Sequence, residues 1–166
     1  MLRDLGPADA DAFVRAFLDD PPLTAALGHD DRPRPAEVRA MLRLEPRNRE
    51  AGERIHFALA DPASDAWIGS LMLHSFNWRH RRAEIGFFVV RAARRRGVAL
   101  EAVRLAVAWA FGRLGLHRMQ ITTLTGNEAT QRLAERAGFA REGVLRDFTF
   151  ERGAFHDNVV FARVAA

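Results

Sequence analysis

Residues 91–100 read RAARRRGVAL and are the most informative segment of the sequence. It places four arginines within six residues and follows them with a glycine and a long apolar segment. Three interpretations compete: a nucleic-acid-binding run, a solvated basic loop, and a cradle for a multiply charged anion at the start of a helix. The first turn of a helix presents N–H groups without backbone partners and a partial positive charge, and a glycine there lets a ligand approach the backbone. These properties favour the cradle, and a pyrophosphate is an anion that fits it.

The composition is that of a folded protein with a core of its own. The chain has 166 residues, of which 48% are hydrophobic, and this predicts one domain over residues 1–166. No apolar run approaches the ~18 residues that a membrane span needs. The first residues, MLRDLGPADADAFV, carry acidic side chains where a secretion signal would be basic and then apolar. We therefore expect a soluble, cytoplasmic protein without a membrane partner.

Several residue types are missing, and each absence excludes a kind of chemistry. The sequence has no cysteine and no tyrosine, and all 25 basic residues are arginine. A disulfide framework, a thiolate nucleophile and a phenolic acid are therefore excluded. The histidines show no metal-ligand spacing, so no metal is expected. The net charge is only +4, so the arginine content by itself gives little reason to expect a nucleic-acid partner.

Hydrophobic periodicity divides the chain into helices, then three strands, then helices and strands in alternation. An amphipathic helix is predicted over 7–20 and a second helix over 36–46, with a proline-broken connection over 19–35 between them. The expected strands cover residues 1–5, 54–61, 66–76, 83–90, 117–125, 141–153 and 154–164, and the later helices cover 98–116 and 127–139. Asn127 is the expected N-cap of the last helix, and Gly153 the turn of a closing hairpin. This order predicts an α/β (α+β) domain with a mixed central sheet of six or seven strands flanked by about four helices.

The glycine that follows the arginines belongs to neither of the two common phosphate fingerprints, G-x-x-x-x-G-K-[ST] and G-x-G-x-x-G. The segment RRRGVA at 94–99 fits the looser pattern [QR]-x-x-G-x-[GA] instead. This segment begins the second of four segments that matter together. In chain order they are AEIGFFV, RRRGVALEAVRLAVAWAF, LGLHRMQITTLTGNEATQRLAERAGF and EGVLRDFTFERGAFHDNVVFA. Together they resemble the GCN5-related N-acetyltransferase (GNAT) superfamily, in particular the branch that acetylates the N-termini of ribosomal proteins. The resemblance covers 83–163, about half of the chain, and implies a mostly antiparallel sheet.

The resemblance implies acetyl-CoA as co-substrate and assigns residues to it. Backbone groups of Phe88, Val89 and Val90 would meet the pantetheine arm. Asn127 would lie near the thiol end, and Arg132 near the nucleotide end. The backbone N–H groups that wrap the pyrophosphate would come from Arg94, Arg95, Arg96, Gly97, Val98 and Ala99.

Arg95 departs from the family pattern, because close relatives usually carry glycine at this position. An arginine there is strained if the position requires a positive φ. The general pattern leaves the position free, so we expect a tolerated substitution. The side chains of Arg91 and Arg95 are expected in solvent, with the 3′-phosphate of the cofactor as the alternative.

Acetyl transfer to an amine needs a neutral amine, and therefore a base. Without a cysteine no acetyl group can be held on the enzyme as a thioester, so the bound amine attacks acetyl-CoA directly. Glu84, at the start of the central strand, is the first candidate base, and in the family it often acts through a water. The alternative is an edge carboxylate paired with Arg82 or Arg141. His74 on the preceding strand is the second candidate base, or else a structural histidine, and a hairpin loop near 76–81 would place it almost opposite 83–84.

The leaving thiolate and the oxyanion also need partners. Thr130 stands three residues after Asn127, where the resembled branch has a serine, and its hydroxyl would hydrogen-bond the departing sulfur. The alternative is that both residues only cap the helix. A backbone N–H of Phe88 or Val89, at a splay in the third long strand, would polarise the thioester carbonyl.

The predicted function is an acetyl-CoA-dependent N-acetyltransferase that moves an acetyl group directly to a primary amine, either a protein N-terminus or a small-molecule amine. His156 and Asp157 of the closing strand would shape the acceptor site. Two alternatives stay open. One is a non-catalytic CoA-binding module, and the other is an RNA- or ribosome-associated protein that uses 77–86 and 91–97 with Trp78 as a stacking platform. For the oligomeric state, the hypothesis is a homodimer.

Overall fold

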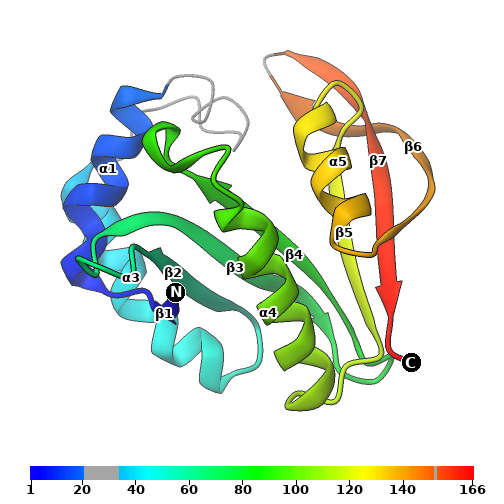
Figure 1. Ribbon diagram of the computed structural model, residues 1–166, viewed down its shortest axis with the longest axis horizontal. Helices are drawn as coiled ribbons and strands as arrows, with labels where there is room; N and C mark the ends of the chain where they lie inside the picture. Colours follow the sequence, from blue (N-terminus) through cyan, green and yellow to red (C-terminus); the bar gives the residue numbers. More distant parts are fainter. Residues whose placement is uncertain (21–33, 152) are drawn as a thin grey trace. The chain divides into compact units, whose positions relative to one another are not determined.

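The computed structural model describes residues 1–20, 34–151 and 153–166 (Figure 1). Most of the proline-broken connection predicted over 19–35 lies outside the described residues. The chain divides into two compact units: unit 1 is Met1–Met72 with Phe87–Ala102, and unit 2 is Leu73–Gly86 with Val103–Ala166. Strands β3 (Trp67–Asn77) and β4 (Arg82–Val89) and helix α4 (Val98–Gly112) each have residues in both units. The single domain over 1–166 stays a prediction.

Seven strands form one hydrogen-bonded sheet in the order β1-β2-β3-β4-β5-β7-β6. Besides β3 and β4, the strands are β1 (Leu2–Asp4), β2 (Ile55–Ala60), β5 (Arg118–Leu124), β6 (Ala140–Glu151) and β7 (Ala154–Val164). β4 runs parallel to β5 over three residue pairs, from Arg82–Arg118 to Glu84–Gln120. The pairs β1–β2, β5–β7 and β6–β7 are antiparallel. The predicted mixed, mostly antiparallel sheet is confirmed.

Unit 1 packs two helices on an aromatic core. A short turn, η1 (Pro7–Asp9), leads into α1 (Ala10–Asp19), and α3 (Pro35–Glu50) lies against α1, as the blue and cyan coils of Figure 1 show. Phe13 and Phe17 are one helical turn apart on α1, and their rings stack at 4.9 Å between centroids. Phe88 of β4 meets both rings edge-on at 5.8 Å. The Phe88 side chain therefore anchors the end of β4 in the core of unit 1.

The predicted end of the second helix near Pro46 is wrong, because α3 continues to Glu50. A proline inside a helix removes one hydrogen bond but keeps a helical φ. Two interactions hold the last turn in place. The N–H of Ala51 donates to the carbonyl of Arg47 at 2.9 Å, and the buried Glu45 is ion-paired with a side chain beyond the helix. These bonds offset the one that the proline lacks.

The apolar segment predicted as a helix over 98–116 forms α4, which ends earlier, at Gly112. Gly115 has a φ of +65°, and the N–H of Leu116 returns to the carbonyl of Ala110 at 3.1 Å, so the chain turns back before 116. The longest described helix, α3, has 16 residues. Among the described parts of the chain, no helix combines the length and the apolar character needed to cross a membrane.

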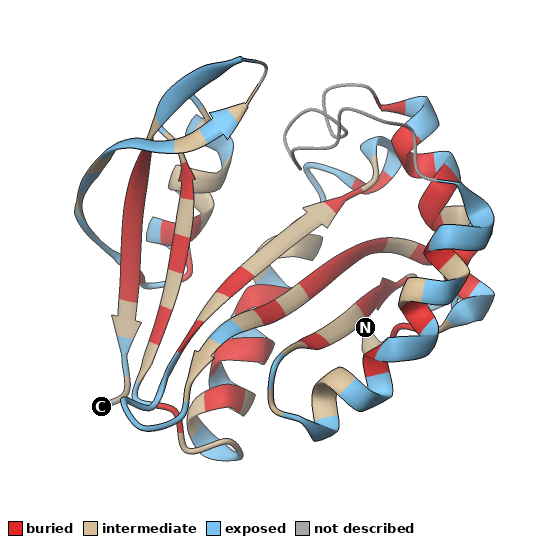
Figure 2. Ribbon diagram, turned by 180° about the vertical axis from the view of Figure 1, so that it is seen from behind, coloured by how far each residue is buried: buried red, intermediate tan, exposed pale blue. Residues whose placement is uncertain are grey.

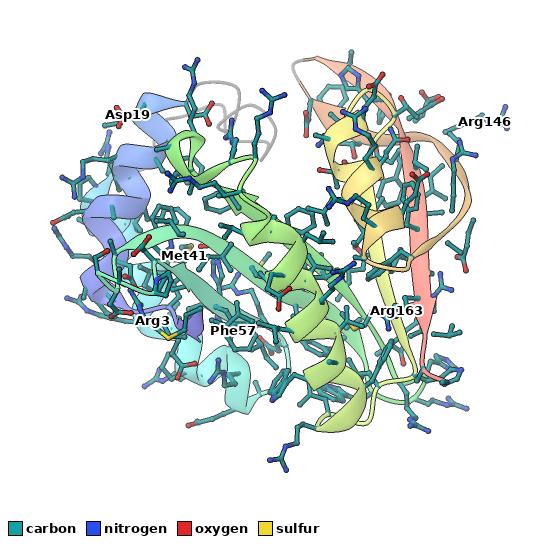
Figure 3. All side chains as sticks on the ribbon, in the orientation of Figure 1. Arg3, Asp19, Met41, Phe57, Arg146 and Arg163 are labelled. Atoms are coloured by element: carbon teal, nitrogen blue, oxygen red, sulfur yellow. The ribbon has the colours of Figure 1, made fainter. Side chains whose placement is uncertain are left out.

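Unit 2 places helix α5 (Glu128–Arg136) on one face of β5, β6 and β7. Arg163 of β7, labelled in Figure 3, identifies this face: its guanidinium donates to the carbonyl of Ala137, just past α5, at 3.0 Å. Arg163 pairs with Met119 of β5, so Met119 and Ile121 face α5, and both are buried. Because strand residues alternate between faces, the even-numbered residues of β5 face away from α5.

β6 and β7 form the predicted closing hairpin, and Gly153 at its turn has a φ of +77°. The buried part of β7 is continuous over residues 158–162, which Figure 2 shows as an unbroken red length of the strand. β6 lies at the edge of the sheet and is mostly exposed.

Candidate active site

The backbone at the end of β4 alternates between two edges of the strand. The N–H of Val90 donates to the carbonyl of Ile68 in β3 at 2.9 Å, so the backbone groups of Val90 and Phe88 point toward β3. Those of Val89 point to the opposite edge, where its carbonyl accepts a hydrogen bond from Nε of Arg94 at 2.9 Å. Of the two donors considered for the thioester, this alternation favours the N–H of Val89.

The Arg94 side chain is committed to contacts within unit 1. Besides the Val89 carbonyl, its guanidinium binds the carboxylate of Asp20, which is only 6% exposed. Arg94 thus braces the turn against the end of α1 and against β4. Its side chain serves the shape of the turn, so the phosphate-binding groups predicted here are those of the backbone.

The backbone between Arg94 and α4 has the form of an anion-binding turn. Arg95 has a φ of +62° and Gly97 a φ of +79°, both in the left-handed region. The N–H of Glu101 donates to the carbonyl of Gly97 at 3.0 Å, so Val98 and Ala99 lie in the first turn of α4. Residues that alternate with left-handed ones direct successive N–H groups into one concavity, and the helix start adds to its positive potential. A pyrophosphate would fit a concavity of this kind.

The expectation that the position of Arg95 is free of any conformational requirement is wrong. A φ of +62° places an arginine where glycine is favoured, at a cost of about 1 kcal/mol. The side chains of Arg91, Arg95 and Arg96 are all exposed. The strain therefore comes from the backbone of this turn and not from any packing of the side chain.

In unit 2, three polar side chains line the face of β4 and β5 that points away from α5, and we call them the polar row: Glu84, Gln120 and Thr122. Gln120 pairs with Glu84 across the two strands, and its Nε2 donates to Oε1 of Glu84 at 2.8 Å and to Oγ1 of Thr122 at 3.2 Å. The alternative pairing of Glu84 with Arg82 or Arg141 is wrong, because the amide on the neighbouring strand is its partner. Glu84 is partly buried, and among the residues that the structure describes only its Oε1 accepts a hydrogen bond from a side chain.

The orientation of the Gln120 amide is fixed from its other side. Nη2 of Arg118 donates to the amide oxygen of Gln120 at 3.2 Å, and the same guanidinium holds Glu142 at 2.5 and 2.7 Å. The hydrogen bond from Arg118 lowers the pKa of Glu142, and the same bond raises the pKa of Arg118. Because Arg118 is a donor only, the amide nitrogen of Gln120 must face Glu84.

His74 lies on the same face of the sheet as Glu84. A Cβ built on Gly86, two residues along β4 from Glu84, would lie 3.6 Å from Nε2 of His74. Its Nδ1 is 2.9 Å from the hydroxyl of Ser75. The N–H of Val90 bonds to Ile68, and in that register of β3 on β4 His74 pairs with Glu84, as predicted, while its ring extends toward Gly86. Unit 2 brings the two candidate bases together on one face.

The start of α5 has the predicted cap. Oδ1 of Asn127 accepts a hydrogen bond from the N–H of Thr130 at 3.2 Å. The cap uses only the backbone N–H of Thr130, and its hydroxyl makes no hydrogen bond within the described part of the chain. Arg132 pairs with Glu128 at 2.8 Å, and both side chains are exposed, so the nucleotide contact of Arg132 stays a prediction.

Two residues that build the site were not identified from the sequence. Gln120 had a signal: in RMQITTL the polar residues 120 and 122 alternate with buried ones, and this marks a polar face of the strand. The sequence carries no signal for Asp20. It follows a helix that already has several acidic residues, and nothing local pairs it with an arginine 74 residues away.

The chain is similar to known proteins over most of its length. Residues 1–140 match the family profile described as "Acetyltransferase (GNAT) domain". The chain is 29% identical over 164 residues to the uncharacterized N-acetyltransferase YoaA of Bacillus subtilis, with 99% of this chain and 92% of that protein covered.

Two solved structures are similar in fold. One is the ribosomal-protein-S5-alanine acetyltransferase of Vibrio fischeri, with a TM-score of 0.87 at 18% identity, covering 98% of this chain and 91% of that one. The other is the spermidine N-acetyltransferase of Vibrio cholerae, solved in complex with CoA and spermine. Its TM-score is 0.84 at 21% identity, and 99% of this chain and 94% of that one are covered.

Proposed function

The chain belongs to the acetyltransferase (GNAT) family, and from that premise we propose that it moves the acetyl group of acetyl-CoA directly to a primary amine with Glu84 as the base. As a member of the family it is an acyltransferase with acetyl-CoA as co-substrate. The observation that supports the role of Glu84 most strongly is its hydrogen bond from Gln120 at 2.8 Å. This bond holds one carboxylate oxygen and leaves the other for a proton.

The donor side of the reaction is assigned to the turn at 94–99. Its backbone N–H groups and the start of α4 would bind the pyrophosphate. Because Asp20 and the Val89 carbonyl already hold Arg94, the turn keeps its shape without the cofactor. A preorganised turn loses little freedom on binding, which favours affinity.

The acceptor must lose a proton before it can attack. An N-terminal amine with a pKa near ~8, or a side-chain amine near ~10, is mostly protonated at pH 7. Glu84 takes that proton, directly or through one water, and His74 is the alternative base on the same face. The neutral nitrogen then forms a bond to the thioester carbon, and the N–H of Val89 stabilises the oxyanion.

The tetrahedral intermediate collapses by breaking the carbon–sulfur bond. CoA leaves as a thiolate, and the surplus proton on the nitrogen neutralises it. The hydroxyl of Thr130 would donate a hydrogen bond to the sulfur as its charge develops. A thiol pKa near ~8.5 makes the thiolate a tolerable leaving group, so a chain without tyrosine needs no stronger acid.

Two acceptor classes follow from the relatives. The Vibrio fischeri enzyme is named for an alanine of a ribosomal protein, and the Vibrio cholerae enzyme for spermidine. Both acceptors are primary amines with further N–H groups along an extended molecule. We therefore propose an extended amine, a peptide N-terminus or a polyamine, as the acceptor. The cytoplasmic location and the homodimer also remain proposals, and sedimentation velocity of the purified chain tests the second.

An acceptor screen tests the proposed function. The full chain is mixed with acetyl-CoA and each of three amines: a tripeptide with a free N-terminus, spermidine and propylamine. Because the chain has no cysteine, a thiol reagent reads only the CoA released. We expect thiol release that matches the acetylated amine mole for mole. The N-acetylated tripeptide is the control and should give none. CoA binding without thiol release for any amine would instead establish a non-catalytic CoA-binding module.

A further inference from the structure

Asn158 is a polar residue in the buried stretch of β7, whose other four members, 159–162, are apolar. It is 6% exposed, and its side-chain oxygen Oδ1 has no hydrogen-bond partner among the residues that the structure describes. A buried carbonyl oxygen without a donor has lost the bonds that it would make with water. Such atoms are rare in folded proteins, and a role in a functional site is one of their explanations.

The register places Asn158 on the face of the polar row. Asn158 pairs with Leu124, and Val160 pairs with Thr122. Directly paired residues share a face, and residues two apart on a strand do so as well. Asn158 therefore faces away from α5, like Gln120 and Thr122. It is the diagonal neighbour of Thr122, at roughly 7–8 Å between Cα atoms.

The adjacent strand bends at the level of Asn158. Leu145 pairs with Asn158 and Thr149 with His156, so three residues of β6 oppose a single residue of β7. In this bulge Asp147 has a φ of +49°, and its N–H donates to Oδ1 of Asp157 at 2.9 Å. Bulges of this kind are frequent beside active sites, where they redirect the chain. The Asp157 carboxylate holds the bulge, whereas Oδ1 of the neighbouring Asn158 has no donor among the described residues.

The distance between Asn158 and the proposed base follows from the register. Gln120, the partner of Glu84, is four residues from Leu124, the partner of Asn158, and two strand spacings separate β4 from β7. At about 3.3 Å per residue and 4.8 Å per spacing, the Cα atoms of Glu84 and Asn158 are roughly 16 Å apart. A molecule that meets both side chains must therefore be extended, with two N–H groups on the order of 10 Å apart.

We propose that Oδ1 of Asn158 accepts a hydrogen bond from an N–H group of the acceptor other than the amine that is acetylated. Asn158 thereby selects extended acceptors over short amines. A peptide offers a backbone amide N–H for this bond and a polyamine offers a second ammonium, and both are the same kind of donor. The inference rests on the proposed function, because Glu84 defines where the reacting amine lies.

The test measures the KM of the wild type and of Asn158→Leu for the tripeptide, spermidine and propylamine. We expect the KM for the tripeptide, for spermidine or for both to rise at least tenfold. The KM values for propylamine and acetyl-CoA should change less than twofold, because neither molecule uses the amide. Asn158→Asp identifies the donor: its added charge should lower the KM for spermidine and leave that for the tripeptide unchanged or raised.

Thr123→Val is the matched control, since it removes a polar group that is 8% exposed from the opposite face of β5. It should leave every KM within twofold. Should Asn158→Leu not fold, Asn158→Ser gives the same measurement with a smaller change.

Asn158→Leu with all KM values unchanged, or with an equal rise for propylamine, would overturn the inference while the proposed function stands. A wild type that releases no thiol with any amine would overturn both.

Discussion

The turn at 94–99 and the polar row are both polar sites, but the backbone forms the first and side chains form the second. The turn exposes the side chains of Arg95 and Arg96, is braced by Arg94 and is shaped by left-handed backbone at Arg95 and Gly97. The polar row keeps a regular strand backbone and relies on side chains, which Gln120 links by hydrogen bonds. The difference indicates what each site handles. A pyrophosphate of fixed shape suits a preformed backbone concavity, whereas proton transfer needs a titratable group in a defined orientation.

Among substitutions that distinguish the turn from the polar row, Arg94→Leu is expected to have the largest effect on stability and on CoA binding. The substitution leaves the carboxylate of Asp20 buried without its partner. We expect a loss of about 2 kcal/mol in the free energy of unfolding, below the ~3–5 kcal/mol of a fully buried pair because Arg94 is 40% exposed. The Kd for CoA should rise about tenfold as the turn loses its brace, at roughly 1.4 kcal/mol per factor of ten.

Urea denaturation and calorimetry with CoA measure the two effects, and Arg91→Leu is the matched control from the same arginine cluster. If Arg94→Leu weakened CoA binding without any loss of stability, the side chain would be a direct phosphate ligand and the brace would be refuted.

A smaller effect, confined to turnover, is expected from Gln120→Leu. The variant removes the donor that orients Glu84, so kcat should fall about tenfold while the Kd for CoA stays within twofold. Gln131→Leu on α5 removes an amide of the same kind outside the polar row and should leave kcat unchanged. Thiol release under saturating acetyl-CoA measures both. An unaltered kcat in Gln120→Leu would mean that the polar row does not position the base.

The smallest expected effect is a gain in stability, whereas Arg94→Leu causes a loss. Arg95→Gly relieves a φ of +62°, and it should raise the free energy of unfolding by about 0.5 kcal/mol after the added freedom of glycine in the unfolded chain is subtracted. The Kd for CoA should not change, because the turn binds through its backbone. Gly97→Ala, at a φ of +79°, should destabilise instead. A weaker affinity in Arg95→Gly would show that the arginine side chain contacts the cofactor, as the alternative with the 3′-phosphate requires.

The sequence was most informative where structure is local. The apolar periodicity of α4, the cap at Asn127 and the turn at Gly153 depend on residues close in the chain, and the structure has all three. The end of α3 was misplaced because bonds made beyond Pro46 hold its last turn, and no local rule reveals them.

In the candidate site, too, the residues in local motifs were predicted and those that act over long sequence distances were not. Glu84, Asn127 and the turn at 94–99 were found because each lies in a motif. The groups that orient them could not be found in this way. Gln120 reaches Glu84 across a strand pair 36 residues apart, and Asp20 reaches Arg94 over 74 residues. The positive φ of Arg95 was missed for a related reason, since an arginine gives no sign of the left-handed backbone that a glycine would.

The most direct test of the central claim compares Glu84→Gln with the wild type in one titration of the acceptor, with acetyl-CoA saturating and the Kd for CoA measured in parallel. Glutamine keeps the size of the side chain and a hydrogen bond to Gln120 but cannot take a proton at pH 7. We expect kcat/KM for the acceptor to fall by about 10²–10³ while the Kd for CoA stays within twofold, since a positioned base contributes roughly 10²–10⁴. Turnover within twofold of the wild type would contradict this expectation and leave His74 on the same face as the candidate base.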